Sequence, residues 1–310
     1  MITEDRTPRE LPLFFDDSNV AALLSLTPTT PGDTIVRLKA DAPLHELPKN
    51  EYAQVLLSAK RVAVLLKTVL GVRRVALVTT SDREIRLIPM HGLSEHWKPV
   101  SGLGLEYNVT YPGYISSKAG PEMSRERLDD IRDAIASSAP PAMSFAYLGG
   151  EDQGKNNIFA KIVRGEVPQW RLWESASHVA FLTPWGNTPG FTVLIPRRHL
   201  SSDVLSISDT NLVDLAGAIW EASKRIRQST LGASRVGLIF EGMEIDYAHA
   251  KLIPILDERA IDTQQLQEPF RETYTGYVSS KSGPIGSYEQ LERMSRELTL
   301  ASNTIRPTEC

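Results

Sequence analysis

One short segment in the second half of the chain holds three side chains capable of acid–base or nucleophilic chemistry. Tyr247, His249 and Lys251 alternate with small or apolar residues and lead into the apolar run Leu252–Pro254. Because successive side chains of a β-strand point to opposite faces, this spacing predicts all three on one face. That face could bind an anion, with His249 as nucleophile or base and Lys251 as the cation. The pattern equally fits a half-exposed strand with a solvated polar face.

A second group of basic side chains follows another apolar run. Arg197, Arg198 and His199 come directly after Pro196, which ends the run Thr192–Ile195. The run predicts a buried strand, and arginine side chains pair well with phosphate oxygens. The spacing therefore indicates either an anion site or a basic strand end exposed to water.

The chain also repeats itself at long range. The segment 111–121, Tyr-Pro-Gly-Tyr-Ile-Ser-Ser-Lys-Ala-Gly-Pro, returns at 274–284 with eight identities in eleven positions, at an offset of 163. Leu87–Pro89 recurs as Leu252–Pro254 at an offset of 165, and shorter matches at offsets of 158 and 161 keep the same order. Slowly changing offsets are what loop insertions produce in a repeated unit.

Each copy predicts the same elements: short β-rich segments, a long helix, two further strands and a terminal helix. In the first copy, apolar residues recur every three or four positions between Asn50, the predicted N-cap, and Gly71, the predicted end of the long helix. Ser124 and Ser287 are predicted to open the terminal helices. The predicted buried strands include Val75–Val78, Thr192–Ile195 and Val236–Phe240.

The two copies occupy about residues 1–145 and 150–305, joined by the breaker-rich segment 137–141, Ser-Ser-Ala-Pro-Pro. Because helices follow strands in each copy, instead of alternating with them one by one, the pattern predicts an α+β unit repeated in tandem. Two similar units commonly pack face to face. We therefore expect a pseudo-twofold dimer within one chain, which is compatible with a monomeric protein.

Taken together, the motifs of the second copy resemble the histidine triad (HIT) hydrolase and transferase family. The resemblance covers about 100 residues in the family's order, in the stretches Asn157–Pro168, Trp173-Glu174, Ala180–Leu182, Pro189–His199, Glu241-Gly242 and Tyr247–Pro254. It implies two tandem HIT-like units, each an antiparallel sheet with helices. The family signature is His-x-His-x-His followed by two apolar residues, and its middle histidine attacks the α-phosphorus of a nucleotide.

The resemblance implies roles for individual residues. His249 stands at the nucleophile position and would form a nucleotidyl-histidine intermediate, while His199 would position a phosphate or a neighbouring side chain. Tyr247 and Lys251 stand at the first and third signature positions. The implied substrate-binding residues are Arg197, Arg198, Thr183 and Asn187. The substrate would be a dinucleoside polyphosphate, a nucleoside phosphoramidate or a sugar nucleotide, with water or a phosphate as the acceptor.

The second copy departs from the signature at two of its three positions. Lys251 resembles the lysine of a bacterial-type subgroup that also carries the Tyr-x-Gly-Tyr-x-Ser-Ser segment. Tyr247 can donate one hydrogen bond but cannot share a proton near neutral pH as imidazole does. The alternatives are therefore an active enzyme, a non-catalytic nucleotide-binding or scaffold protein, and a HIT scaffold repurposed in a specialised pathway. Asn157 and Ala160 replace the cysteines of the family's occasional zinc site, so no metal or cofactor is expected.

The first copy keeps the plan without the site. Aligning the matching runs puts Glu84 at the nucleophile position, Asp82 and Arg86 beside it, and about Asp41 at the position of His199. Carboxylates at these places would repel a phosphate. The first copy is therefore predicted to be structural.

Composition limits the partners. The 310 residues include 34 Lys or Arg against 38 Asp or Glu, a formal net charge of −4, which disfavours nucleic acid. No run approaches the ~20 apolar residues that cross a bilayer, and the acidic N-terminal segment differs from a basic signal peptide. The single cysteine, Cys310, cannot form an intramolecular disulfide. We expect a cytoplasmic protein that binds a nucleotide or another phosphate-containing small molecule, without membrane partners.

Overall fold

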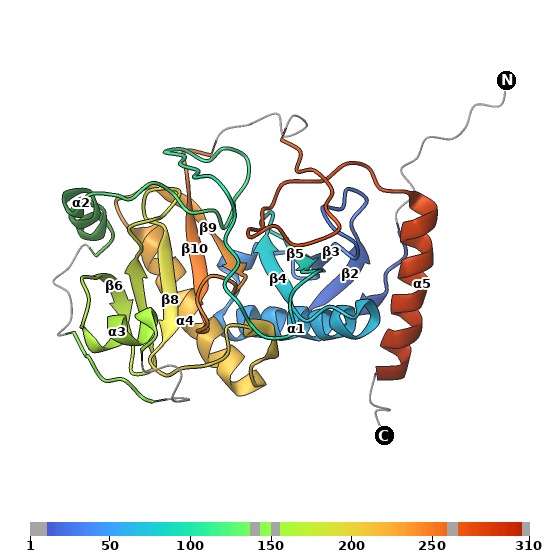
Figure 1. Cartoon of the computed structure of the whole chain (residues 1–310), viewed down its shortest axis with the longest axis horizontal. Helices are drawn as coiled ribbons and strands as arrows, with labels where there is room; N and C mark the ends of the chain where they lie inside the picture. Colours follow the sequence, from blue (N-terminus) through green and yellow to red (C-terminus); the bar gives the residue numbers. More distant parts are fainter. Residues whose placement is uncertain (1–10, 137–142, 150–155, 259–265, 306–310) are drawn as a thin grey trace.

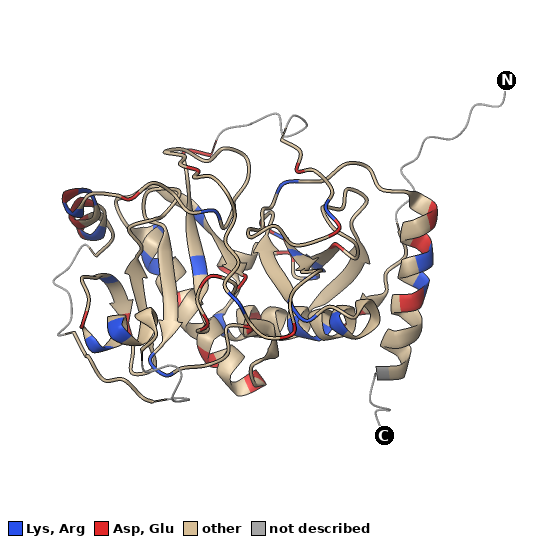
Figure 2. Cartoon of the chain, in the orientation of Figure 1, with Lys and Arg blue, Asp and Glu red and all other residues tan. Residues whose placement is uncertain are grey.

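The computed structural model describes residues 11–136, 143–149, 156–258 and 266–305. They form an α+β fold built on one large antiparallel sheet (Figure 1). The predicted linker 137–141 and Cys310 lie outside the described residues. In the described part of the chain no helix has the length and apolar character needed to cross a membrane. Basic and acidic residues are mixed over both halves of the molecule (Figure 2).

Ten strands pair in the order β1-β2-β3-β5-β4-β9-β10-β8-β7-β6, and every neighbouring pair is antiparallel. The strands are β1 Phe15–Asp16, β2 Val20–Leu24, β3 Thr34–Leu38, β4 Val75–Thr79, β5 Glu84–Pro89, β6 Trp170–Glu174, β7 His178–Leu182, β8 Thr192–Pro196, β9 Ala233–Phe240 and β10 Ala250–Leu256. Counted from either edge towards the centre, each half places its five strands in the same order relative to the sequence: first, second, third, fifth, fourth. At the centre β4 pairs with β9 through Leu77–Phe240 and Val78–Ile239.

The helices are α1 Lys49–Leu70, α2 Arg125–Ala136, α3 Ile158–Arg164, α4 Asp209–Gln228 and α5 Tyr288–Ile305, with short 3-10 turns η1 Leu44–Glu46 and η3 Val204–Ser206. The prediction of Asn50 as N-cap of α1 is wrong. Pro48 takes that position because its fixed φ is compatible with the extended backbone there, at φ −53° and ψ 147°. Gly71 ends α1 as predicted, at φ 65°, a conformation open to glycine without steric cost.

Corresponding hairpins pair in the same register in both halves. Val75 lies opposite Pro89 in β4–β5, and Val236 lies opposite Pro254 in β9–β10. In hairpins β2–β3 and β7–β8, each pair of opposite residues in the first corresponds to a pair in the second at a constant offset of 158. The helices α1 and α4 pack against each other and across one face of the sheet.

The terminal helices are exchanged between the two halves. Each packs on the opposite half, and not on the strands that precede it in its own half. Helix α2 contacts β6 and α4, whereas α5 contacts α1 and β2 (Figure 1). Ser124 opens α2 as predicted, accepting a hydrogen bond from Arg127 N at 3.2 Å. Helix α5 begins directly after Ser287, also as predicted.

The two repeated segments at 111–121 and 274–284 meet where the halves join. Ser117 Oγ accepts from Val278 N at 2.9 Å, and Ser280 Oγ accepts from Ile115 N at 2.9 Å. Ser116 and Ser279 form a β-bridge between these two bonds. Together with α3, the segments cover the sheet face that α1 and α4 leave open, where a second apolar cluster includes Ile115, Phe159 and Val278.

Candidate active site around His249

Tyr247, His249 and Lys251 lie on the sheet face that α3 and the repeated segments cover. Strand β10 begins only at Ala250, so Tyr247 and His249 stand just before the strand, which corrects the prediction that all three lie within it. His249 is only 3% exposed, and Tyr247 and Lys251 are buried as well. This burial excludes the alternative of a solvated polar strand face.

The imidazole of His249 is held in one tautomer. Its Nδ1 lies 2.7 Å from the main-chain oxygen of Tyr247, and because a carbonyl only accepts, Nδ1 carries the proton. Among the described residues no group hydrogen-bonds Nε2, which keeps its lone pair. Burial, and then the charge of Lys251, lower the pKa of His249 to about 4. The side chain is therefore neutral at pH 7 and suited to act as a nucleophile.

Tyr247 braces the end of a neighbouring strand. Its hydroxyl donates to the main-chain oxygen of Pro196 at 2.8 Å, and burial raises its pKa. Its ring meets Phe159 edge-on at 5.8 Å and His199 at 5.1 Å between centroids. Phe159 also contacts the ring of His249 at 5.3 Å. Tyr247 thus supports the nucleophile through its carbonyl and through packing, while its phenol bonds elsewhere.

Lys251 is part of a buried cluster of charges. Its Nζ donates to Glu241 Oε2 at 2.8 Å, Glu244 Oε2 at 3.1 Å and Ser117 O at 3.2 Å. Burial alone disfavours the ammonium, but the two carboxylates outweigh it and raise the pKa of Lys251. Glu241 Oε1 also accepts from Ser117 Oγ at 2.9 Å and from the Tyr274 hydroxyl at 2.6 Å. The charge of Lys251 is balanced here, which corrects the expectation of a free cation for phosphate.

Arg197 is engaged on all three of its nitrogens. The buried guanidinium donates to Ser175 O at 2.8 Å, Ser144 O at 2.8 Å and Glu174 Oε2 at 2.9 Å. The arginine expected to bind a phosphate instead ties the end of β8 to the β6–β7 turn. Each nitrogen of the guanidinium already donates to an acceptor within the protein, so none is left for a substrate.

The neighbours of Arg197 also have protein partners. Arg198 is exposed and donates to Asn211 Oδ1 in the first turn of α4, on the helix side of the sheet. His199 Nε2 lies 2.9 Å from the main-chain oxygen of Asp246 and steadies the loop that leads to His249. Of the predicted basic cluster, only His199 therefore lies close to the signature residues.

Asn187 and Thr183 stabilise loops. Asn187 Nδ2 donates to Ser116 O and to Lys118 O, both at 3.0 Å, and so holds the first repeated segment. Thr183 Oγ1 accepts from Trp185 N at 3.4 Å. The Nδ2 bonds of Asn187 join the second half of the chain to the first.

Arg74, from the first half, reaches the same region and was missed in the sequence. Its Nη1 donates to Ser202 Oγ and Gly242 O, both at 3.1 Å. After burial and Lys251, the charge of Arg74 also lowers the pKa of His249. The available signal was the repeat itself, in which Arg74 corresponds to Arg235 at the offset of 161.

The corresponding place in the first half is filled by an ion pair. Arg86, at the position of Lys251, donates Nε and Nη2 to the two oxygens of Asp33, both at 2.6 Å. Its Nη1 donates to Lys281 O in the second repeated segment, as Lys251 donates to the first. Glu84 pairs with Arg37 at 3.1 Å. No cluster of three or more possible metal ligands occurs within the described ranges.

Comparison with curated proteins finds relatives that match about a third of the chain. An adenosine 5'-monophosphoramidase of Saccharomyces cerevisiae is 28% identical over 103 residues, which are 33% of this chain and 65% of the relative, just under two thirds of its length. An uncharacterized HIT-like protein of Borreliella burgdorferi is 30% identical over 103 residues, which are 31% of this chain and 73% of the relative. No protein-family model matches the chain.

Solved structures show weaker likenesses over a longer range. A GalT-like protein from Arabidopsis thaliana has a TM-score of 0.48 at 9% identity, covering 91% of this chain and 83% of that one. A HIT-like protein from Bartonella henselae has a TM-score of 0.30 at 22% identity, covering 47% of this chain and 96% of that one. These values are too low to bear on activity.

Proposed function

Because the chain belongs to the histidine triad family, we propose that its second half acts on a nucleotide through nucleophilic attack by His249 on the α-phosphorus. The observation that carries the proposal is the neutral imidazole, with Nδ1–H fixed on the Tyr247 carbonyl and the Nε2 lone pair unused. The bond cleaved would be a phosphoanhydride or a phosphoramidate. The name of the yeast relative, a monophosphoramidase, favours a phosphorus–nitrogen bond.

The proposed reaction has two displacements at phosphorus. First, the Nε2 lone pair forms a bond to the α-phosphorus while the leaving group departs with its electron pair, giving a nucleotidyl-histidine. Water or a phosphate then attacks the same phosphorus and displaces Nε2, which regains its lone pair. Positive charge develops on the imidazole in the first step, and the Tyr247 carbonyl at 2.7 Å from Nδ1 stabilises it.

The residues around His249 then take positioning roles. Lys251 joins β10 to the first repeated segment through Ser117 O, and His199 fixes the loop at Asp246. Arg74 contributes positive potential from the first half. Phe159 covers His249, so in this proposal its ring turns aside, or stacks on the substrate, when a nucleotide enters.

We also propose that the chain is a tandem pair of such units, about residues 1–145 and 150–305, related by a pseudo-twofold axis near Ser116 and Ser279. Equal strand orders, equal hairpin registers and the reciprocal serine hydrogen bonds support this arrangement. The first unit would be structural, the chain could function as a monomer, and its location would be cytoplasmic.

A second candidate is a non-catalytic nucleotide-binding or scaffold protein. It is favoured by the pairing of Lys251 with two carboxylates and by the closed surface over His249. Both observations leave little positive charge beside the histidine for a phosphate. The active enzyme remains our main proposal because, among the described residues, no group uses the Nε2 lone pair of His249.

Intact-mass measurement at neutral pH separates the two candidates. The protein is incubated with adenosine 5'-phosphoramidate, a dinucleoside tetraphosphate and a sugar nucleotide. We expect a covalent nucleotidyl adduct that is absent in His249→Ala and retained in the control His96→Ala, a histidine exposed in the first half. Binding without adduct or turnover would favour the scaffold. Turnover that persists in His249→Ala would refute the nucleophile.

A further inference from the structure

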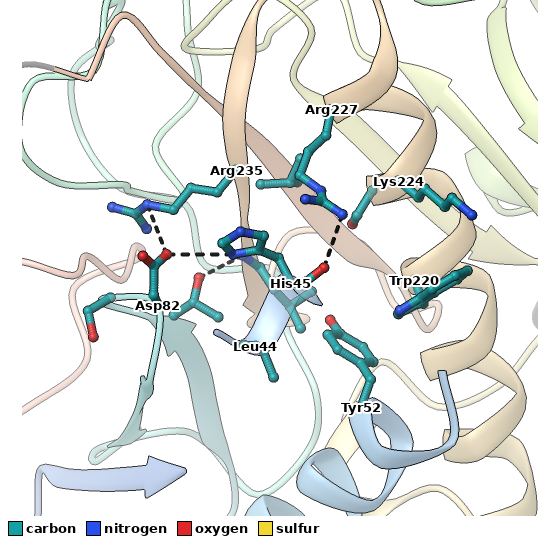
Figure 3. A pocket seen from close by; sticks show the side chains of 13 residues that line it. Leu44, His45, Tyr52, Asp82, Trp220, Lys224, Arg227 and Arg235 are labelled. Carbon is teal, nitrogen blue, oxygen red and sulfur yellow. Dashed lines mark hydrogen bonds and ion pairs between the residues drawn. The ribbon is translucent and has the colours of Figure 1, made fainter. Parts of the chain in front are cut away.

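A surface hollow lies on the helix side of the sheet, between η1, the end of β4 and α4 (Figure 3). His249 lies on the opposite face, so the hollow is separate from the candidate active site. It brings together side chains from both halves of the chain, and we refer to it as the α4 pocket. Its lining includes His45, Tyr52, Trp220, Lys224, Arg227 and Arg235.

The hydroxyl of a largely buried tyrosine points into the α4 pocket. Tyr52 is only 6% exposed, and its hydroxyl has no hydrogen-bond partner among the described residues. Figure 3 shows this hydroxyl directed into the hollow, between His45 and Trp220. Burial raises the pKa of Tyr52, so the group is a proton donor at pH 7. The hydroxyl faces the open space of the hollow, where it is able to donate to a ligand oxygen.

Positive charge in the α4 pocket is only partly balanced. Arg235 pairs with Glu258 at 2.7 Å and with Asp82 at 3.5 Å. In the described part of the chain, neither Lys224 nor Arg227 forms an ion pair with a carboxylate. Arg227 donates Nη2 to the main-chain oxygen of His45 at 3.0 Å, and its Nε is buried without an acceptor. Two cations therefore remain for an external anion.

The matching place on α1 shows what would neutralise this charge. Lys67 holds the same position along α1 as Arg227 along α4, eighteen residues after the start of each helix. Lys67 Nζ pairs with Asp203 at 2.8 Å. Asp203 corresponds to His45 at the offset of 158 that relates the β2–β3 and β7–β8 hairpins. The carboxylate present on one side is thus a histidine on the other.

His45 does not add to the unbalanced charge. Burial, and then the charge of Arg227, lower the pKa of His45, so its imidazole is neutral at pH 7. Beside it, the indole of Trp220 is held in place by its Nε1 bond to Leu47 O at 2.9 Å. Lys224 Nζ lies 5.0 Å from the centre of the Trp220 ring. A flat aromatic surface is therefore fixed next to a cation.

We propose that the α4 pocket binds a small organic anion with an aromatic body, an aryl phosphate or aryl carboxylate. Its oxyanion meets Arg227, Lys224 and the Tyr52 hydroxyl, and its ring lies against Trp220. The proposal is independent of the chemistry at His249.

Calorimetric titration of the full chain with phenyl phosphate and with benzoate tests the proposal. We expect one equivalent to bind, with affinity reduced at least tenfold in Arg227→Gln and in Tyr52→Phe. The matched control is Arg225→Gln, which removes the same charge from the same turn of α4 outside the pocket, and it should bind as the parent does. Lys224→Gln changes an exposed position, so it tests the loss of affinity without disturbing the packing of the core.

The two probes distinguish the sources of the ligand. Tighter binding of phenyl phosphate identifies a phosphate ligand, tighter binding of benzoate identifies a carboxylate, and either supports the pocket. Benzyl alcohol, which has no charge, should not bind. The proposal would be overturned if neither anion bound, or if Arg227→Gln and Lys224→Gln bound the anions as tightly as the parent does. It would also be overturned if Arg225→Gln weakened binding as much as Arg227→Gln does. So would loss of binding in His249→Ala, which would place the ligand on the other face.

Discussion

The side chains around His249 are connected through a few buried hydrogen bonds, and these bonds decide what each residue can do. Arg197 shows the limit of inference from residue type, because the planar guanidinium suits carbonyls and carboxylates as well as phosphates. Its three partners, at Ser144, Glu174 and Ser175, are distant or unremarkable in the sequence. Lys251 is similar, since neither the family match at Glu241-Gly242 nor the position of Glu244 indicates that these carboxylates pair with it.

The buried neutral state of His249 predicts a pH-dependent stability. Its pKa is about 4 in the folded protein and 6.5 when unfolded, so the unfolded chain binds more protons between these values. The contribution of His249 to the free energy of unfolding is then complete above pH 6.5. It falls by on the order of 3 kcal/mol as the pH drops towards 4. Urea denaturation at several pH values should show this slope, reduced in His249→Gln. An identical slope in that variant would mean that His249 titrates normally.

The ion-pair cluster predicts a large cost for removing its cation alone. Lys251→Met leaves Glu241 and Glu244 without a counter-charge in a buried site, and we expect a loss of about 3 kcal/mol in denaturant unfolding. Adding Glu241→Gln should restore part of that loss. Lys39→Met is the control, because its pair with Asp16 is exposed and should contribute less than about 1 kcal/mol. Equal effects of the two lysine changes would contradict the structure.

Helices and strands with a strong apolar period were the elements best predicted from the sequence. The long helix ending at Gly71 and the strands around Val75, Thr192 and Val236 all occur. The periodic residues of these elements face the sheet core, so local pattern and tertiary packing agree. The packing of α2 and α5 could not be predicted in this way, because an amphipathic helix does not specify which of two similar surfaces it covers.

Helix α5 is expected to stabilise the half that it covers. Leu298 is fully buried in α5, which contacts α1 and β2. Leu298→Ala should cost about 2–5 kcal/mol and should speed amide hydrogen exchange in α1 and β2 before β7 and β8. Leu300→Ala, at an exposed position in the same helix, should change neither. Faster exchange confined to the second half would contradict the packing of α5.

At the scale of the whole molecule, the sheet depends on one central pairing. Strand β9 pairs with β4, so residues 150–305 alone would expose the unpaired edge of β9 and the side of α4 that packs on α1. Exposed strand edges and apolar faces promote self-association. We predict that this segment, expressed alone, dimerises or aggregates in analytical ultracentrifugation. A soluble, active monomer would show that the first half is dispensable.

The exchange of terminal helices also bears on how the protein is made. Chains emerge from the ribosome with the N-terminus first, and domains commonly fold in that order. Helix α2 is synthesised before β6, the strand on which it packs, and α5, which covers α1 and β2, is synthesised after β6–β10. The first half therefore lacks its covering helix until β6–β10 have been translated. Its folding is thus completed by residues that follow the described strands of the second half.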